Sequence, residues 1–209
     1  MNFGKKQKRM KNRIWPENTT VIGLSGNIAS GKSTVSKILT RYGFYHIDAD
    51  QINREIYENN SFFKEQAIKL FQTTDRKIIS KIVFNSKEKR FQLEQLVHPL
   101  IYKESLKKIK EISQKKGHHF IVYEAALLYE TGRYKEMDYF WLVETEEEHQ
   151  IKRFIKRNQG TKEEATRIIE AQVPITQKRK YADRIFINNG SMEELVQQIE
   201  TAVKELTQI

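Results

Sequence analysis

A short run near the N-terminus has the residue types and spacing of a loop that binds phosphate groups. Residues 26–33 read Gly-Asn-Ile-Ala-Ser-Gly-Lys-Ser and fit the pattern Gly-x-x-x-x-Gly-Lys-Ser/Thr. The glycines permit backbone torsions closed to other residues, so successive N–H groups can converge on a phosphate at the positive end of the next helix. Lys32 would add a cation for the β- and γ-phosphates, and Ser33 would offer a hydroxyl to Mg²⁺. The residues expected to contact the nucleotide are Asn27, Ile28, Ala29, Ser30, Gly31, Lys32, Ser33 and Thr34.

Two aspartates stand where a second substrate could be activated. Asp48 and Asp50 directly follow residues 44–47, which read as a strand. Ligands of α/β proteins bind at the carboxyl ends of such strands. One carboxylate could therefore face the phosphate loop as a base for an acceptor hydroxyl, while the other caps the next helix. Capping alone is the alternative, because aspartate is common at the start of helices.

A basic segment further along predicts a lid over the nucleotide. Residues 146–157 and 161–171 read as two helices, and the second opens with the spacing of a capping box at Thr161. Arg153 and Arg157 share one face of the first helix, where a guanidinium could stabilise charge that develops on a transferred phosphoryl group. The alternative is an exposed basic helix face. A lid is required in small kinases because water must be kept from the γ-phosphate.

Short runs rich in β-branched and aromatic residues predict a five-stranded sheet. They cover residues 20–24, 44–47, 120–123, 139–143 and 184–187. Helical patterns lie between these strands, and strands that alternate with helices favour an α/β fold. We therefore predict a mainly parallel sheet flanked by helices, with the phosphate loop between its first strand and a helix over residues 33–42.

The stretch between the second and third strands is too long for a single crossover. Apolar residues recur there at helical spacing, which predicts an inserted helical subdomain over about residues 51–116. Pro99 is expected to end or kink a helix within it, because proline lacks an N–H and its ring clashes with the preceding turn. The predicted organisation is a basic, disordered tail over residues 1–18 and one domain over residues 19–209, with the lid at residues 152–172.

Composition excludes several classes of protein. The chain has 209 residues and no cysteine, which excludes disulfide scaffolds, zinc ribbons, iron–sulfur proteins and thiol nucleophiles. No apolar run approaches the roughly 20 residues that span a bilayer. The basic tail lacks the apolar segment of a signal peptide, so we expect a cytoplasmic protein without membrane contact. The net charge is +10, and the tail leaves nucleic-acid binding as a minor possibility.

Several blocks, in order and at similar spacing, resemble the dephospho-coenzyme A kinase family. They are residues 25–34, residues 47–50, His98 with Pro99, and residues 124–132. The resemblance covers nearly everything except the tail. It implies a P-loop kinase fold with a helical CoA-binding insertion and a helical lid. It also implies that ATP, with Mg²⁺, phosphorylates the 3′-hydroxyl of the ribose of dephospho-CoA. We expect the chain to act as a monomer or a small homo-oligomer.

The resemblance also implies roles for residues around the acceptor. Asp50 would be the general base, and Asp48 would help to orient substrate or metal. Arg54 would bind an acidic part of the acceptor, with a surface arginine as the alternative. His98 would turn the chain beside the acceptor pocket, although a lone histidine is more often structural. Leu128 and Glu130 would line the same pocket.

The resemblance further implies residues for the nucleotide and the metal. Asn189 follows the last strand and would approach the adenine. Glu124 stands where the family usually has Asp, so its carboxylate is one methylene further from the backbone, and it is expected to reach Mg²⁺ through a bound water. Ser33 would be the direct ligand. Together with Lys32 and Asp50, Arg157 is the third expected catalytic group.

Two rival functions remain. A different small kinase would use the same phosphate loop and lid, and the blocks at residues 48–50 and 127–130 argue against it. A nucleic-acid-binding ATPase would use the basic tail and residues 178–180. Salt-sensitive RNA binding with stimulated ATP hydrolysis would favour that second rival.

Overall fold

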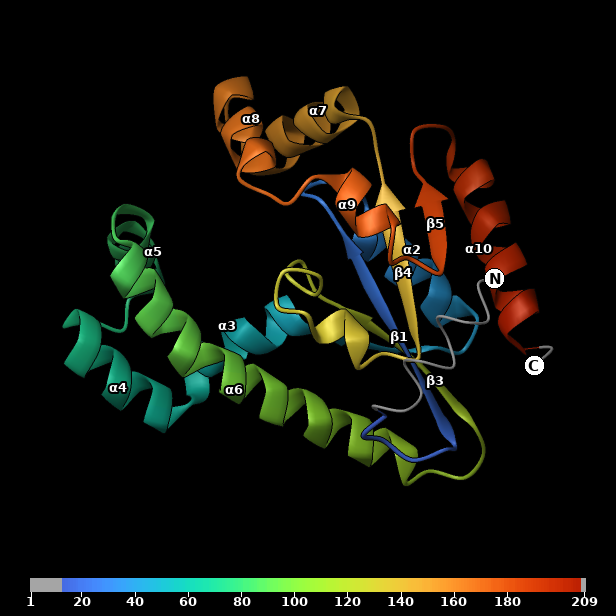
Figure 1. Ribbon diagram of the computed structural model, residues 1–209, viewed down its shortest axis with the longest axis horizontal. Coiled ribbons are helices and arrows are strands. Elements are labelled where there is room, and N and C mark those ends of the chain that lie inside the picture. Colours follow the sequence, from blue (N-terminus) through green and yellow to red (C-terminus); the bar gives the residue numbers. More distant parts are fainter. Residues whose placement is uncertain (1–12, 208–209) are drawn as a thin grey trace. The chain divides into compact units, whose positions relative to one another are not determined.

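The computed structural model describes residues 13–207, and the chain divides into two compact units. The larger unit holds the chain up to Ile47 and from Ile112 onward, and the smaller unit is Asp48–Glu111. Figure 1 traces both units by colour along the sequence. The smaller unit thus occupies the chain between the second and third strands.

The larger unit is built on a parallel sheet of five strands, as the sequence predicts. The strands are β1 (Thr19–Gly26), β2 (Tyr45–Asp48), β3 (His119–Glu124), β4 (Tyr139–Glu144) and β5 (Arg184–Ile187). Their order across the sheet is β2-β3-β1-β4-β5, which places the strand before the phosphate loop in the centre (Figure 1). Each predicted strand is confirmed, with ends that differ by at most two residues.

Apolar groups cover both faces of the central strand, which explains its lack of alternation between polar and apolar residues. Ile22 and Leu24 join one apolar cluster with α2 (Lys32–Arg41) and α10 (Met192–Thr207). Gly23 lies between these two residues, so it faces the opposite side of the sheet. A Cβ added to it would lie 2.6 Å from Leu128 Cδ2, so the chain after β3 packs directly on the strand backbone.

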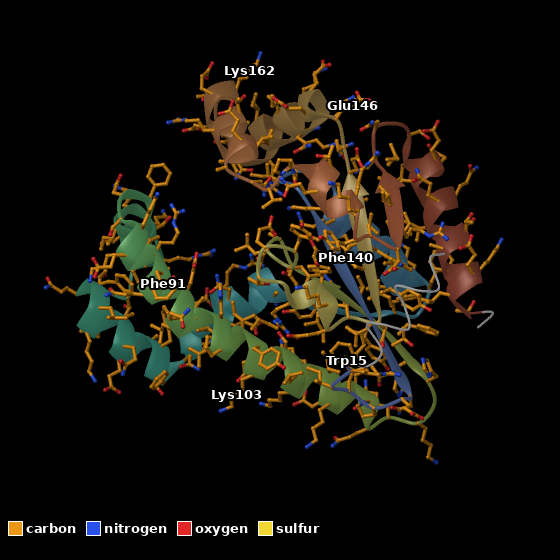
Figure 2. The ribbon with its side chains drawn as sticks, in the orientation of Figure 1. Trp15, Phe91, Lys103, Phe140, Glu146 and Lys162 are labelled. Carbon is orange, nitrogen blue, oxygen red and sulfur yellow. The ribbon has the colours of Figure 1, made fainter. Side chains whose placement is uncertain are left out.

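Three further helices follow β4 in the larger unit. They are α7 (Glu147–Asn158), α8 (Lys162–Glu170) and α9 (Ile175–Arg179). The capping box predicted at Thr161 is confirmed, because its hydroxyl accepts from the N–H of Glu164 and the Glu164 carboxylate accepts from the N–H of Thr161. Figure 2 shows Glu146 and Lys162 at the starts of α7 and α8. The predicted lid segment is therefore a pair of helices joined by a short turn.

Four helices account for the smaller unit. They are α3 (Ala49–Asn59), α4 (Ser61–Phe71), α5 (Arg76–Asn85) and α6 (Lys87–Ser113). Asn60 and Asp75 cap α4 and α5 with their side-chain oxygens. Apolar residues at helical spacing form the buried interior, namely Ile52, Ile56, Phe63, Ala67, Phe71 and Ile79.

Pro99 is predicted to end or kink a helix, and the first of these two alternatives is wrong. α6 runs through it as one helix of 27 residues. Proline removes the hydrogen bond that its own N–H would make to the carbonyl four residues earlier, and its ring clashes with that carbonyl, at a combined cost of about 3 kcal/mol. Val97 and Ile109, which lie on either side of it in α6, are buried, so tertiary packing keeps the helix continuous despite that loss.

The structure describes residues 13–18 of the predicted tail, and residues 1–12 lie outside the described residues. Trp15, labelled in Figure 2, is buried, and its indole N–H donates to the carboxylate of Asp138 at 2.8 Å. The same carboxylate accepts from the N–H of Val21 at the start of β1. Among the described helices, none combines the length and the apolar character needed to cross a membrane.

Candidate active site

The phosphate loop lies between β1 and α2, where the sequence predicts it. Gly31 has φ +99°, a left-handed conformation that favours glycine, and a Cβ there would collide with the amide of Asn188. Asn188 donates to the carbonyl of Ser30 at 2.7 Å, and Thr145 donates to the same oxygen at 2.9 Å. Residues that directly follow β4 and β5 therefore hold the backbone of the loop through the carbonyl of Ser30. The sequence analysis did not assign Thr145, and it expected residues 188–191 to approach the adenine without giving Asn188 a role at the loop. The position of both residues directly after a strand is the signal that points to them.

Polar atoms of the loop lack partners within the described part of the chain. They are Ser25 Oγ, Asn27 Oδ1 and Ser30 Oγ, all buried. Buried polar atoms are nearly always hydrogen-bonded, so this group of them fits a site that takes a polar ligand. The side chain of Lys32 folds along the loop, with Nζ donating to the carbonyls of Gly26 at 2.8 Å and Asn27 at 3.1 Å. The loop thus combines buried polar atoms with the ammonium group of Lys32, and this combination suits a phosphate ligand.

Replacing Gly31 by alanine is expected to weaken ATP binding at least tenfold. The left-handed backbone costs a non-glycine residue about 1–3 kcal/mol, and the methyl group would push Asn188 off the loop. Titration calorimetry with Mg-ATP measures the loss. Gly43→Ala is the matched control, because Gly43 also has a positive φ of +84° but nothing lies within 4 Å of its added Cβ. Equal ATP affinity in both variants would contradict the proposed cradle.

Two parts of the predicted lid segment contact the phosphate loop. Gln172 at its end accepts a hydrogen bond from the N–H of Ile28 at 2.9 Å. Arg153 donates to the carbonyl of Asn188 at 2.9 Å and reaches the carbonyl of Ser30 at 3.4 Å. Arg157, one turn further along α7, is exposed and donates to Asn158. Of the two arginines, the structure thus brings Arg153 to the loop.

Asn189, the residue predicted near the adenine, joins the end of β5 to the start of α7. Its amide oxygen accepts from the N–H of Glu146 at 2.8 Å, and its amide nitrogen donates to the Glu146 carboxylate at 2.9 Å. The amide therefore anchors the entrance to the lid segment. Its neighbour Asn188 supports the loop itself.

The carboxylate of Glu124 ends β3 beside the phosphate-loop strand, in register with Leu24. Its Oε2 accepts a hydrogen bond from Ser36 Oγ at 2.8 Å and lies 3.0 Å from His46 Nε2. Burial has the largest influence and by itself would raise the pKa of Glu124. The contacts with His46 and Ser36, with the charge of Lys32, outweigh burial and hold the pKa below its ordinary value. Glu124 is therefore an anion at neutral pH.

The donors near the loop fit Mg²⁺ as an ion shared with a nucleotide. Ser33 is exposed at the start of α2, and Glu124 supplies an ionised carboxylate. Within residues 13–207, no group of three or more acidic or histidine side chains could hold a metal by themselves. Mg²⁺ usually binds through one or two protein oxygens together with waters and substrate phosphates, so a hydroxyl and one carboxylate are a sufficient donor set.

The predicted acceptor residues after β3 are packed into the larger unit. Leu128 is buried against Gly23. Glu130 forms an ion pair with Lys178 of α9, with 2.7 Å between Oε1 and Nζ, and the lysine side chain is fully buried. Sequence reasoning placed Lys178 only in a basic cluster. A buried lysine needs a compensating anion, so Glu130 fixes α9 to the chain after β3.

Replacing Lys178 by alanine is expected to destabilise the fold by about 3–5 kcal/mol, because it leaves the Glu130 carboxylate unpaired in a partly buried place. Urea unfolding measures this change. The double variant Lys178→Met with Glu130→Gln removes both charges at similar volume and should recover most of the stability. If the single and double variants lose the same amount, the ion pair is not the source of the effect.

The structure assigns the capping role to one of the two aspartates. Asp48 Oδ1 accepts from the N–H groups of Asp50 at 2.8 Å and Gln51 at 3.0 Å, so Asp48 is the N-cap of α3. Arg54 lies six residues after Asp48, with Nη2 3.7 Å from Asp48 Oδ2. Asp50 is exposed in the first turn of α3, and His98 is half-buried on α6. These four predicted residues belong to the smaller unit, and the phosphate loop belongs to the larger one.

Comparisons with known proteins agree with one another. The family model described as dephospho-CoA kinase matches residues 20–194. A dephospho-CoA kinase of Carboxydothermus hydrogenoformans is 40% identical over 193 residues, which are 88% of this chain and 93% of that protein. The one of Staphylococcus saprophyticus is 38% identical over 193 residues, with the same shares of the two chains.

Solved structures give the same result. The protein TT1252 of Thermus thermophilus superposes with a TM-score of 0.79 at 30% identity, over 90% of this chain and 98% of that one. A dephospho-CoA kinase from Campylobacter jejuni superposes with a TM-score of 0.66 at 28% identity, over 91% of this chain and 98% of that one. A gluconokinase from Sinorhizobium meliloti, at 15% identity and a TM-score of 0.52, shares the fold.

Proposed function

This chain belongs to the dephospho-CoA kinase family, and from that premise we propose that it transfers the γ-phosphoryl group of ATP to the 3′-hydroxyl of the ribose of dephospho-CoA. The products are CoA and ADP, and the reaction is the last step of CoA biosynthesis. The observation that carries the proposal is the family match over residues 20–194, which includes both the phosphate loop and Glu124.

The nucleotide end of the site is the loop and the start of α2. Residues 27–34 surround the phosphates, with Gly31 shaping the cradle. Lys32 moves its ammonium from the loop carbonyls to the β- and γ-phosphate oxygens when ATP enters. Positioning and charge neutralisation supply most of the catalysis in phosphoryl transfer, and this end of the site supplies both.

Ser33 and Glu124 would hold Mg²⁺ between the loop and β3. The ion would supply positive charge to the phosphate oxygens. Ser33 would be the direct ligand, and Glu124 would act through a bound water. The low pKa of Glu124 keeps its carboxylate ready to accept that hydrogen bond at neutral pH.

The acceptor end uses the smaller unit. Asp50 accepts the proton of the 3′-hydroxyl. The oxygen of that hydroxyl forms a bond to the γ-phosphorus, and the bond from this phosphorus to the bridging oxygen of ADP breaks. Asp48 caps α3 with Oδ1, and its other oxygen, Oδ2, lies near Arg54. Asp48 therefore orients Arg54, which binds an acidic group of the acceptor. His98 lies beside the acceptor. Leu128 and Glu130 are the further residues that we assign to binding of the acceptor.

The lid brings arginine charge to the transferred group. Arg153 is held at the loop by backbone carbonyls, which suits a group that binds phosphate once the nucleotide is present. Arg157 reaches the γ-phosphoryl group when the lid closes, and there it stabilises the transition state. Asn189 lies near the adenine. The lid also keeps water away, so that ATP is not hydrolysed.

The test is ADP formation from Mg-ATP with a panel of acceptors. The panel contains dephospho-CoA, nucleosides, nucleotides, shikimate and single-stranded RNA. We expect turnover with dephospho-CoA alone, and a product with the mass of CoA. Turnover with another acceptor and silence with dephospho-CoA would overturn the proposal and leave only the fold and the phosphate chemistry.

A further inference from the structure

A histidine that no step of the reaction uses contacts the carboxylate of Glu124. His46 on β2 and Ser36 on α2 both meet the same oxygen, Oε2, at 3.0 Å and 2.8 Å. The Glu124 side chain is 9% exposed, and that of His46 is 28% exposed. Two different elements therefore hold one end of this carboxylate at the edge of the site.

The chemistry of the contact fixes which atom carries the hydrogen. An ionised carboxylate only accepts hydrogen bonds, so Nε2 of His46 must be the donor. With the Ser36 hydroxyl also donating, Oε2 has two partners. Both contacts use Oε2, which leaves Oε1 as the oxygen for another donor.

The length of the side chain makes such support necessary. Glutamate has one more rotatable side-chain bond than aspartate, so its carboxylate has more orientations to lose. Restricting a long side chain to one orientation costs rotamer freedom. A carboxylate held in advance by two donors has already lost that freedom when the ion arrives.

We propose that His46 is a positioning residue for Glu124. With Ser36 it occupies Oε2 and thereby presents Oε1 to a water bound by Mg²⁺. His46 contacts neither the nucleotide nor the ion, and it acts only through Glu124. The inference rests on the proposed function, because it assigns a task to Glu124 in that reaction.

The test measures metal affinity apart from turnover. Mn²⁺ binding in the presence of a non-hydrolysable ATP analogue is followed by electron paramagnetic resonance. His46→Ala is expected to weaken Mn²⁺ binding about tenfold, the lower end of the usual loss for an outer-sphere partner. His46→Gln, whose amide can still donate to Oε2, should stay within about twofold of wild type.

A matched control comes from the other end of the same sheet. His118 directly precedes β3, and its ring lies 2.9 Å from Thr20 Oγ1 at the start of β1. Glu124 lies at the opposite end of β3, beside Leu24 of β1. His118→Ala should leave Mn²⁺ affinity unchanged. If His118→Ala weakens binding as much as His46→Ala does, or if His46→Gln loses as much as His46→Ala, the proposal is overturned.

A double-variant cycle with Glu124→Asp separates positioning from a general structural effect. The shorter aspartate depends less on support from β2, so the tenfold cost of His46→Ala should shrink to about twofold in the Glu124→Asp background. An equal cost in both backgrounds would overturn the proposal. Because Mn²⁺ binding is read without an acceptor, a failure of dephospho-CoA to be phosphorylated would contradict the proposed function and not this inference.

Discussion

Lys32→Ala is expected to lower kcat for CoA formation roughly 10³-fold, as removal of one group that stabilises transition-state charge does in other enzymes. The ammonium group of Lys32 donates hydrogen bonds to the carbonyls of Gly26 and Asn27 in the loop. The backbone of the loop is held by Thr145 and Asn188, so its shape should survive the loss of the side chain. Steady-state ADP release at saturating ATP and dephospho-CoA measures the effect.

The control for this variant is Lys37→Ala, which removes an exposed lysine from the same helix. It should retain wild-type kcat. Circular dichroism and thermal unfolding should show that Lys32→Ala remains folded. A kcat near wild type in the folded Lys32→Ala protein would contradict the phosphate-loop mechanism.

Asp50→Asn is expected to lower kcat about 10³-fold while leaving the affinity for ATP within about twofold of wild type. Asparagine has nearly the same shape but cannot accept the proton of the 3′-hydroxyl. The cap of α3 is the side chain of Asp48, so this substitution does not remove it. Rapid-quench measurement of bound product, with titration calorimetry for ATP, separates the two effects.

Two nearby carboxylates serve for comparison. Glu58→Gln removes an exposed carboxylate further along α3 and should leave kcat unchanged. Asp48→Asn keeps a good capping residue and should affect the KM for dephospho-CoA more than kcat, because Arg54 loses its anionic partner. Should Asp50→Asn turn over at the wild-type rate, the base would have to be another group.

The parts of this protein that could be predicted from sequence depend on residues close together in the chain. A strand buried on both faces, the loop at residues 26–33 and the capping box at Thr161 each follow from a short local pattern. The structure confirms all three. The assignment of the cap among the two aspartates stayed open, because a capping side chain and a catalytic one share the same residue type and position. Only the hydrogen bonds from Asp50 and Gln51 decide for Asp48.

Long-range contacts decided what the pattern could not. Pro99 stays inside a helix because tertiary packing offsets a lost hydrogen bond, and no local rule weighs those two energies. Lys178 and Glu130 are 48 residues apart, and the burial that makes them a pair exists only once the chain has folded. Glu124, Ser36 and His46 meet for the same reason, on three different elements. The sequence by itself predicted a phosphate-binding loop after β1, because the residues that predict it are consecutive in the chain. The tertiary structure decided which distant groups hold that loop and the residues around it in place.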